Sequence, residues 1–156
     1  NQAKINTDFR RTTVAAKECL KRTGHTSSAI ELEDGTIVTA HSSLLLGCSA
    51  ALLLNVMKHL AGIDHDTKLI PQSMIEPIQY TKVNYLGGHN PRLHTDEVLV
   101  ALSVLSNVDD RCTKALAQLP KLRGCQVHCT VMLSEVDQKI FKKLGVNLTC
   151  EPVLKK

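Results

Sequence analysis

Apolar and polar positions alternate with two different periods in the first quarter of the chain. Residues 7–24 carry apolar side chains at helical spacing, and Thr7 or Asp8 can cap the helix that this spacing predicts. Two runs with a period of two follow at 28–33 and 36–41, separated by an Asp-Gly pair. Because Asp-Gly favours the tight turn between antiparallel strands, the two runs predict a β-hairpin.

Residues 46–61 are apolar on nearly every side and stop at Gly62, which predicts a central helix. Such a helix has to be covered on most of its surface, so we expect it to pack between a sheet and other helices. Its most apolar stretch, 44–54, is well short of the roughly 20 apolar residues that cross a membrane. We therefore expect a buried core helix and no membrane partner.

Beyond the central helix, the pattern predicts four more helices and two or three more strands. The helices are expected from Glu76 (with Pro77 in the first turn) to Gly87 or Gly88, from a Thr95 cap to Asn107, from Asp109 or Asp110 to Pro120, and from a capping box of Ser134 and Asp137 to Gly145. The strands are expected at 125–133 and 146–152, with 67–70 as a further short strand.

This order of elements predicts an α/β fold with three layers, a mixed β-sheet of four to five strands and helices on both faces. The final strand–helix–strand unit is long enough to join parallel strands by a right-handed crossover. A length of 156 residues suits a single α/β domain, which we place at 1–156. Because the sequence starts with Asn rather than Met, we expect it to be a piece of a longer protein.

Charge and cysteine content narrow the classes of function. The net charge of +4 is spread along the chain, which argues against a nucleic-acid partner and still suits an anionic ligand. Most of the six cysteines fall in apolar helix or strand patterns, where a free thiol behaves as a small buried hydrophobic group. This setting indicates reduced thiols and a cytoplasmic protein rather than a disulfide-rich secreted domain.

Three long stretches carry a resemblance to a known family: AIELEDGTIVTAHSSLLLGCSAALLLN (29–55), EPIQYTKVNYLGGHNPRLHTDEVLVALS (76–103) and LPKLRGCQVHCTVMLSEVDQKIFKKLGVNLTCEP (119–152). They resemble the C-terminal domain of an uncharacterised bacterial family known as domain of unknown function 1846. The family has no established activity, and its full-length members carry a Gly-rich, phosphate-loop-like segment far upstream. The resemblance implies that the N-terminal remainder of the parent chain is a partner of this domain. It also implies that this part binds no cofactor of its own.

The predicted order of elements is also similar to the cytidine-deaminase-like fold. Enzymes of that fold hold zinc with a His-x-Glu segment and a Pro-Cys-x-x-Cys segment. Neither segment occurs in this chain, and LGCSAALLL (46–54) stands where the first would lie. The resemblance therefore implies the topology of that fold without its zinc site.

The stretch GGHNPRLHTDEV (87–98) is the first candidate binding site. It offers four polar side chains before a predicted helix start: His89, Asn90, Arg92 and His94. The unpaired amides of a helix start attract phosphate or carboxylate groups, and an arginine can clamp them. The alternative is a capped helix after a solvated loop, because Asp96 and Glu97 themselves complement the helix dipole.

The second candidate is the loop between the second strand and the central helix, TAHSSLLLGCS (39–49). It places His41, Ser42 and Ser43 beside a helix start. Ligands of open α/β sheets bind outside the carboxyl ends of strands, which is where this loop is expected. The alternative is that a serine caps the helix and the glycine permits close packing.

The histidines and cysteines do not predict a metal site. His94 and Asp96 lack a third ligand at tight spacing. On a strand, Cys125 and Cys129 face one side and His128 faces the other, so the three cannot converge on zinc without a bulge. We expect no metal, and catalytic residues stay unassigned.

These features leave two hypotheses about function. In the first, the domain contributes a pocket for an anionic or phosphorylated ligand to a larger nucleotide-utilising enzyme, and this part alone has no turnover. In the second, the domain is a non-catalytic docking or oligomerisation module. An enclosed pocket that holds Arg92 and His94 would favour the first, and a flat exposed apolar patch would favour the second. A homo-oligomer is expected in either case.

Overall fold

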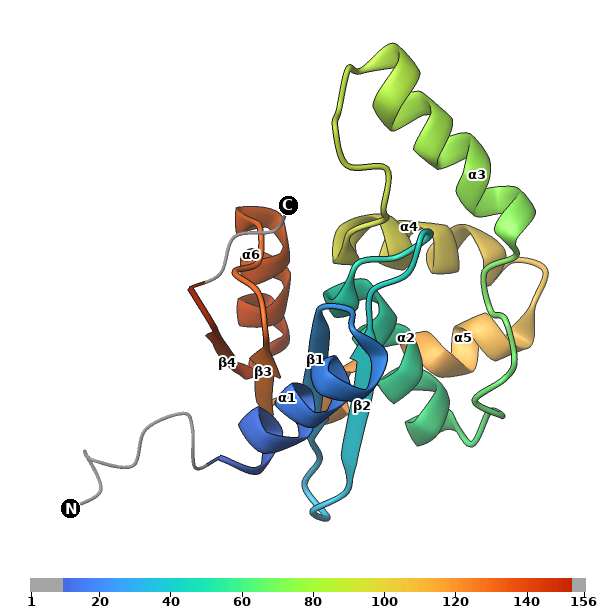
Figure 1. The fold of residues 1–156 in the computed structure, drawn as a ribbon. Coiled ribbons are helices and arrows are strands. Elements are labelled where there is room, and N and C mark those ends of the chain that lie inside the picture. The colour runs from blue at the N-terminus through green and yellow to red at the C-terminus, as the bar shows by residue number, and fades with distance from the viewer. Residues whose placement is uncertain (1–9, 153–156) are drawn as a thin grey trace.

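The structure, a computed structural model, describes residues 10–152 and has an α/β fold with a mixed sheet, as predicted. Figure 1 shows the helices arranged around the sheet. The first helix begins at Arg11 after an Arg10 N-cap, whereas the predicted caps Thr7 and Asp8 lie outside the described residues.

Four strands form the sheet in the order β2-β1-β3-β4. They are β1 (Ser27–Glu31), β2 (Ile37–His41), β3 (Gln126–Cys129) and β4 (Asn147–Cys150). The central strand β1 is antiparallel to both of its neighbours, and β3 and β4 are parallel. The predicted hairpin and the predicted parallel strand–helix–strand unit are therefore confirmed.

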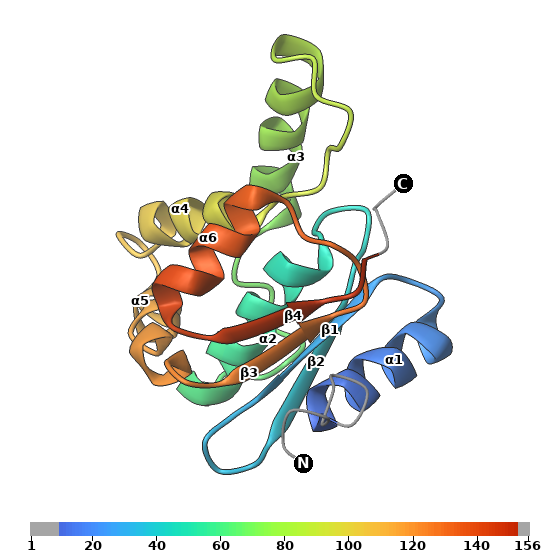
Figure 2. The ribbon, with the colours of Figure 1, turned by 90° about the vertical axis from the view of Figure 1, so that its left-hand side faces the viewer.

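The helices cover both faces of the sheet, so the three-layer prediction is confirmed. They are α1 (Arg11–Thr23), α2 (Cys48–Ala61), α3 (Gln72–Tyr80) with the π-helical turn η3 (Thr81–Tyr85), α4 (Thr95–Leu105), α5 (Asp110–Leu116), the 3-10 turn η4 (Leu119–Leu122) and α6 (Glu135–Leu144). Figure 2 shows α1 alone on one face and α2, α4, α5 and α6 on the other. The likeness to the cytidine-deaminase-like fold stays a prediction.

The central helix α2 forms the middle of the core, as its apolar pattern predicts. Leu52, Leu53, Val56 and Met57 are almost completely buried between the sheet and the helices α4 and α5. Burial of side chains of this size contributes about 1.5–3 kcal/mol each relative to exposure. No helix in the described range 10–152 is both long and apolar enough to span a membrane.

Helix α3 begins at Gln72, earlier than the predicted start at Glu76, and Pro77 lies inside the helix rather than in its first turn. The reason is tertiary packing, because Ile75 is buried and Met74 packs against the core. Burial of Met74 and Ile75 therefore stabilises helical structure before the predicted start at Glu76.

The predicted strand at 67–70 is wrong, since this segment is an irregular loop with a bend at Leu69 and Ile70. Leu69 and Ile70 are nevertheless buried, and the Leu69 carbonyl accepts a weak hydrogen bond from the Cys112 thiol. Their apolar character therefore reflects packing of a loop against the core rather than pairing in the sheet.

Several predicted ends were too long. Helix α4 stops at Leu105 instead of Asn107, because the side chains of Ser106 and Asn107 donate back to the carbonyls of Ser103 and Val104. Helix α5, which Asp109 caps, likewise stops at Leu116, before a separate 3-10 turn. The strands β3 and β4 are also shorter than predicted.

Candidate functional site

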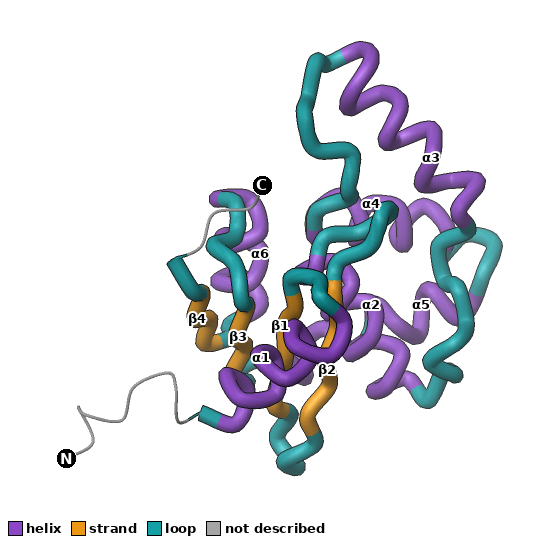
Figure 3. Tube along the Cα trace, in the orientation of Figure 1, coloured by secondary structure: helices purple, strands orange, loops and turns teal. Residues whose placement is uncertain are grey.

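Two loops meet beside the carboxyl ends of the parallel strands. The loop that follows β2 and the loop that precedes α4 lie side by side, joined by an isolated parallel bridge between Leu46 and Leu93 (Figure 3). The Leu93 N–H donates to the Leu45 carbonyl at 3.0 Å, and the Gly47 N–H donates to the Leu93 carbonyl at 3.2 Å. The two candidate stretches of the sequence are therefore in direct contact.

Arg92 links the two loops. Its Nε donates to the Ser43 carbonyl, and its backbone N–H donates to Asn90 Oδ1 at 3.1 Å. Arg92 is half-buried in this position and lines neither of the two pockets described below. Its contacts make Arg92 a residue that positions Ser43, while His89 is exposed on the same loop.

Lys82 links the loop that precedes α4 to the first turn of that helix. Its Nζ donates to the Arg92 carbonyl and lies 2.9 Å from Glu97 Oε1. The N-cap of α4 is His94 rather than the predicted Thr95, and the His94 N–H donates to Glu97 Oε1 at 2.7 Å. Glu97 therefore occupies the place that an external anion would take at this helix start.

The contacts of Glu97 shift its pKa. Burial raises the pKa of the carboxyl group, but the hydrogen bonds from His94 and Lys82 outweigh burial and lower it from 4.5 to about 2. Because the folded pKa is the lower one, the carboxylate stabilises the fold above pH 4.5. This stabilisation is lost as the pH falls from 4.5 through 2.

Glu97→Gln is expected to flatten the loss of stability between pH 4.5 and 2 and to cost about 1–2 kcal/mol at pH 7, after allowance for solvent screening of a partly exposed group. Urea unfolding at several pH values measures both effects. Glu135→Gln, in the exposed first turn of α6, is the matched control. An equal loss of unfolding free energy between pH 4.5 and 2 in wild type and Glu97→Gln would contradict this explanation.

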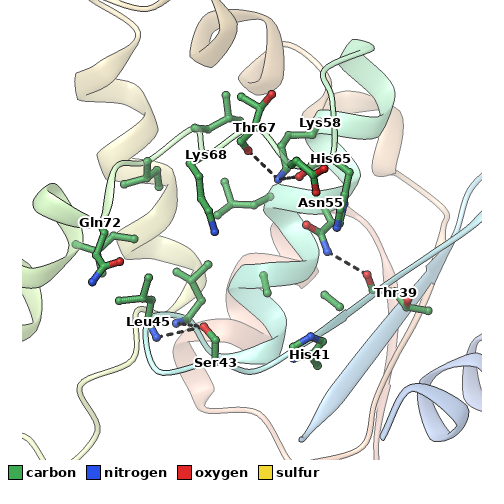
Figure 4. Close-up of a pocket in the computed structure, with 18 of the residues that line it drawn as sticks. Thr39, His41, Ser43, Leu45, Asn55, Lys58, His65, Thr67, Lys68 and Gln72 are labelled. Carbon is green, nitrogen blue, oxygen red and sulfur yellow. Dashed lines mark hydrogen bonds between the residues drawn. The ribbon is translucent and has the colours of Figure 1, made fainter. Parts of the chain in front are cut away.

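The larger pocket, with a volume of about 1000 Å³, lies between β2, α2 and the segment 65–72. We call it the β2–α2 pocket (Figure 4). His41 and Ser43 line it, and the His41 ring stacks on His25 with 5.6 Å between ring centroids. Ser42 is buried outside the pocket, where its Oγ accepts a hydrogen bond from Thr26 Oγ1 at 2.9 Å.

The charge of the β2–α2 pocket is mainly positive. Arg22, Lys58 and Lys68 line it, and among the lining residues in the described range Asp66 is the only acid. Lys58 Nζ donates to the carbonyls of His65 and Thr67 at 2.8 and 3.1 Å. Figure 4 shows the Lys68 side chain extending from its loop toward the middle of the pocket.

The two ammonium groups in this pocket repel each other. Burial lowers the pKa of Lys58, and the charge of Lys68 lowers it further, against smaller opposing effects of Asp66 and Asp64. A negative charge between Lys58 and Lys68 would relieve this repulsion. The electrostatics of the pocket therefore favour an anionic ligand.

The smaller pocket, of about 390 Å³, lies where α2, α4 and α6 begin. We call it the helix-start pocket. Asn90 and His94 line it together with Asp137, whose buried carboxylate accepts hydrogen bonds from the Ser49 hydroxyl, the Thr95 hydroxyl and the Thr95 N–H at 2.9, 2.6 and 2.9 Å. The chain thus supplies its own anion at this junction, which ties three helices together.

No group of three His, Cys, Asp or Glu residues between 10 and 152 is arranged to hold a metal ion. His128 is buried on the α1 side of the sheet, where its ring nitrogens lie 2.7 Å from Thr149 Oγ1 and 3.0 Å from Glu151 Oε2. Cys125 contacts the carbonyl of Lys121 instead. The side chains of Cys125 and His128 therefore contact different parts of the fold.

The predicted site residues are therefore distributed over two pockets and the link between them. His41 and Ser43 line the β2–α2 pocket, and Asn90 and His94 line the helix-start pocket. The sequence analysis missed Lys58 and Lys68, because one lies at the end of an apolar helix and the other in a polar turn. Neither position carries a local signal, since only the fold brings them together.

The sequence model of the family described as "Domain of unknown function DUF1846, C-terminal" matches residues 8–156. The chain belongs to this family, as the resemblance in its three long stretches predicts.

Bacterial relatives share the sequence over nearly the whole chain. UPF0371 protein cu0538 of Corynebacterium urealyticum is 55% identical over 147 residues, which cover 94% of this chain and 30% of the relative. UPF0371 protein CE2832 of Corynebacterium efficiens is 56% identical over 143 residues, covering 91% and 29%. UPF0371 protein SpyM50764 of Streptococcus pyogenes is 42% identical over 153 residues, covering 98% and 31%. The chain therefore spans about a third of the length of these curated relatives.

Proposed function

We propose that this domain contributes a binding pocket for a small anionic ligand, of the phosphorylated class, to a larger nucleotide-utilising cytoplasmic enzyme. The observation that carries the proposal is the positive charge of the β2–α2 pocket. Three fixed positive charges face one acid there. A volume of about 1000 Å³ is large enough for a metabolite or a nucleotide.

The polar groups of the pocket support this assignment. Lys58 is anchored by two carbonyls on the loop, which leaves its charge fixed at the wall, whereas Lys68 extends into the space. Because Lys58 is already held in place, it can bind phosphate oxygens without the cost of ordering its side chain on binding. His41 and Ser43 add polar groups on the opposite wall.

The length of the relatives supports the proposal that this domain is part of a larger enzyme. About two thirds of each relative lies outside the matched region, so a larger chain surrounds this domain in those proteins. In the proposal, that larger part supplies the reacting groups and this domain supplies one wall of the site. We expect no turnover from the 156-residue chain alone.

Lys68→Ala is expected to weaken binding of pyrophosphate or ADP at least about ten-fold, because a charge-assisted hydrogen bond contributes about 1.5–3 kcal/mol and 1.4 kcal/mol is ten-fold in affinity. Thermal shift and titration calorimetry measure the affinity, which should also fall with added salt. Lys139→Ala, an exposed lysine on α6, is the matched control. Equal affinity of wild type and Lys68→Ala would overturn the assignment to this pocket.

Arg92→Ala separates positioning from direct contact in the same experiment. Arg92 touches the Ser43 carbonyl but does not line the pocket, so its loss should lower the melting temperature more than it lowers affinity. A loss of affinity as large as that of Lys68→Ala would instead place the ligand against Arg92.

A further inference from the structure

Three thiols meet behind the helix-start pocket. Cys129 ends β3, Cys150 ends β4, and Cys48 begins α2. Interactions with both other thiols raise the pKa of Cys129. Cys48 and Cys129 are buried, whereas Cys150 is half-buried and thus open to small reagents.

The backbone places Cys129 and Cys150 at bonding range. They are direct partners in the register of the parallel strands β3 and β4, which lie side by side in Figure 2. Neighbouring strands are about 4.7–4.9 Å apart, and disulfides join Cα atoms about 4.4–6.8 Å apart. Residues paired in register also present their side chains on the same face. The Cα spacing of a disulfide is therefore compatible with this pairing.

The surroundings of Cys150 favour its thiolate. A hydrogen bond with Cys129 and one from the Leu133 N–H lower the pKa of Cys150 to about 7, against the opposing effects of burial and of the Asp137 charge. The Cys129 thiol is the opposite case, since its hydrogen bonds to Cys150 and Cys48, together with burial, raise its pKa well above the usual 9.0. Cys150 is thus the nucleophile of the pair and Cys129 the proton donor.

We propose that Cys150 and Cys129 form a redox-sensitive thiol pair that a hydroperoxide converts to a disulfide. The Cys150 thiolate attacks one peroxide oxygen, the O–O bond breaks, and the leaving hydroxide takes a proton to become water. Cys129 sulfur then attacks the sulfenic sulfur of Cys150, the S–O bond breaks, and the thiol proton leaves with the hydroxyl group as a second water. In total, two thiols and one hydrogen peroxide give one disulfide and two waters.

The pair lies next to residues of the helix-start pocket. Leu133 and Cys48 line that pocket, and both are hydrogen-bonded to members of the thiol group. Formation of the disulfide removes the hydrogen bonds of Cys129 to Cys48 and of Leu133 to the Cys150 thiolate. Oxidation therefore changes the contacts of two residues that line the helix-start pocket.

The test uses hydrogen peroxide on the reduced 156-residue chain, followed by alkylation and mass mapping. We expect the intact mass before alkylation to fall by about 2 Da and, after alkylation, the peptides of Cys129 and Cys150 to be joined. Iodoacetamide should react with Cys150 at a half-maximal rate near pH 7. Cys48→Ser should retain the linkage, and Cys150→Ser should abolish it.

Cys112→Ser is the matched control, because Cys112 is a buried thiol of α5, on another part of the core. It should leave the linkage and its rate unchanged. A linkage of Cys129 to Cys48, oxidation of Cys150 to the sulfinic acid without a linkage, or full retention of both free thiols would each overturn the proposal.

Discussion

Asp137→Ala is expected to lower the free energy of unfolding by about 3 kcal/mol, which is among the largest effects of any polar substitution in this domain. The Asp137 carboxylate accepts three hydrogen bonds from Ser49 and Thr95, and it is almost fully buried. Removal of the acceptor leaves these donors without partners at a junction of three helices. Each buried unsatisfied donor costs about 1–3 kcal/mol, less the cost of burying the charge itself.

Urea unfolding of Asp137→Ala and Asp137→Asn measures this effect. The asparagine variant keeps one acceptor oxygen for Thr95 and should lose about half as much. Thr95→Val combined with Asp137→Ala tests the contact itself, because the two losses should be strongly non-additive. A change of less than about 0.5 kcal/mol in Asp137→Ala would show that the junction is not held by this carboxylate.

Phe141→Ala is expected to lower the free energy of unfolding by about 3–5 kcal/mol. Phe141 is the largest fully buried side chain in the described range and fixes α6 to the core beside β4. Its loss leaves a cavity that the strands and the η4 turn can close only in part.

Val136→Ala is the matched control for Phe141→Ala, because Val136 lies on the same helix and is 45% exposed. Its substitution should change stability by no more than about 0.5 kcal/mol. Equal losses in the two variants would mean that α6 does not pack on the sheet as the structure has it.

The elements with strong local signals could be predicted from the sequence. The hairpin follows from the Asp-Gly pair, since Asp34 Oδ1 accepts from the Thr36 N–H and the turn fixes the register of β1 and β2. The central helix follows from its apolar surface and its stop at Gly62, whose φ is +72°. Local chemistry is sufficient for elements of this kind.

The capping box at the start of α6 shows where local reasoning ends. Ser134 is the N-cap and its Oγ accepts from the Asp137 N–H, as predicted. The carboxylate of Asp137, however, turns away to Thr95, which lies 42 residues earlier. No spacing in the sequence signals such a partner, because the contact exists only once α4 and α6 have packed.

The residues of the candidate binding site also divide into those with a local signal and those without one. The polar loop residues His41, Ser43 and His94 could be proposed because they precede helix starts. The lysines that give the β2–α2 pocket its charge could not, because Lys58 lies on α2 and Lys68 on the loop that follows it, and only folding brings them to one pocket. Arg92 has the residue type of an anion ligand but is used to join two loops.

The central claim is that an anion binds between Lys58 and Lys68, and the most direct measurement is a backbone amide NMR titration of the 156-residue chain with pyrophosphate. We predict saturable shifts confined to residues 39–46, 54–58 and 65–70, weakened in Lys68→Ala and unchanged in Lys139→Ala. Shifts confined to residues 90–97 and 131–137, or the absence of saturable shifts at millimolar pyrophosphate, would contradict it.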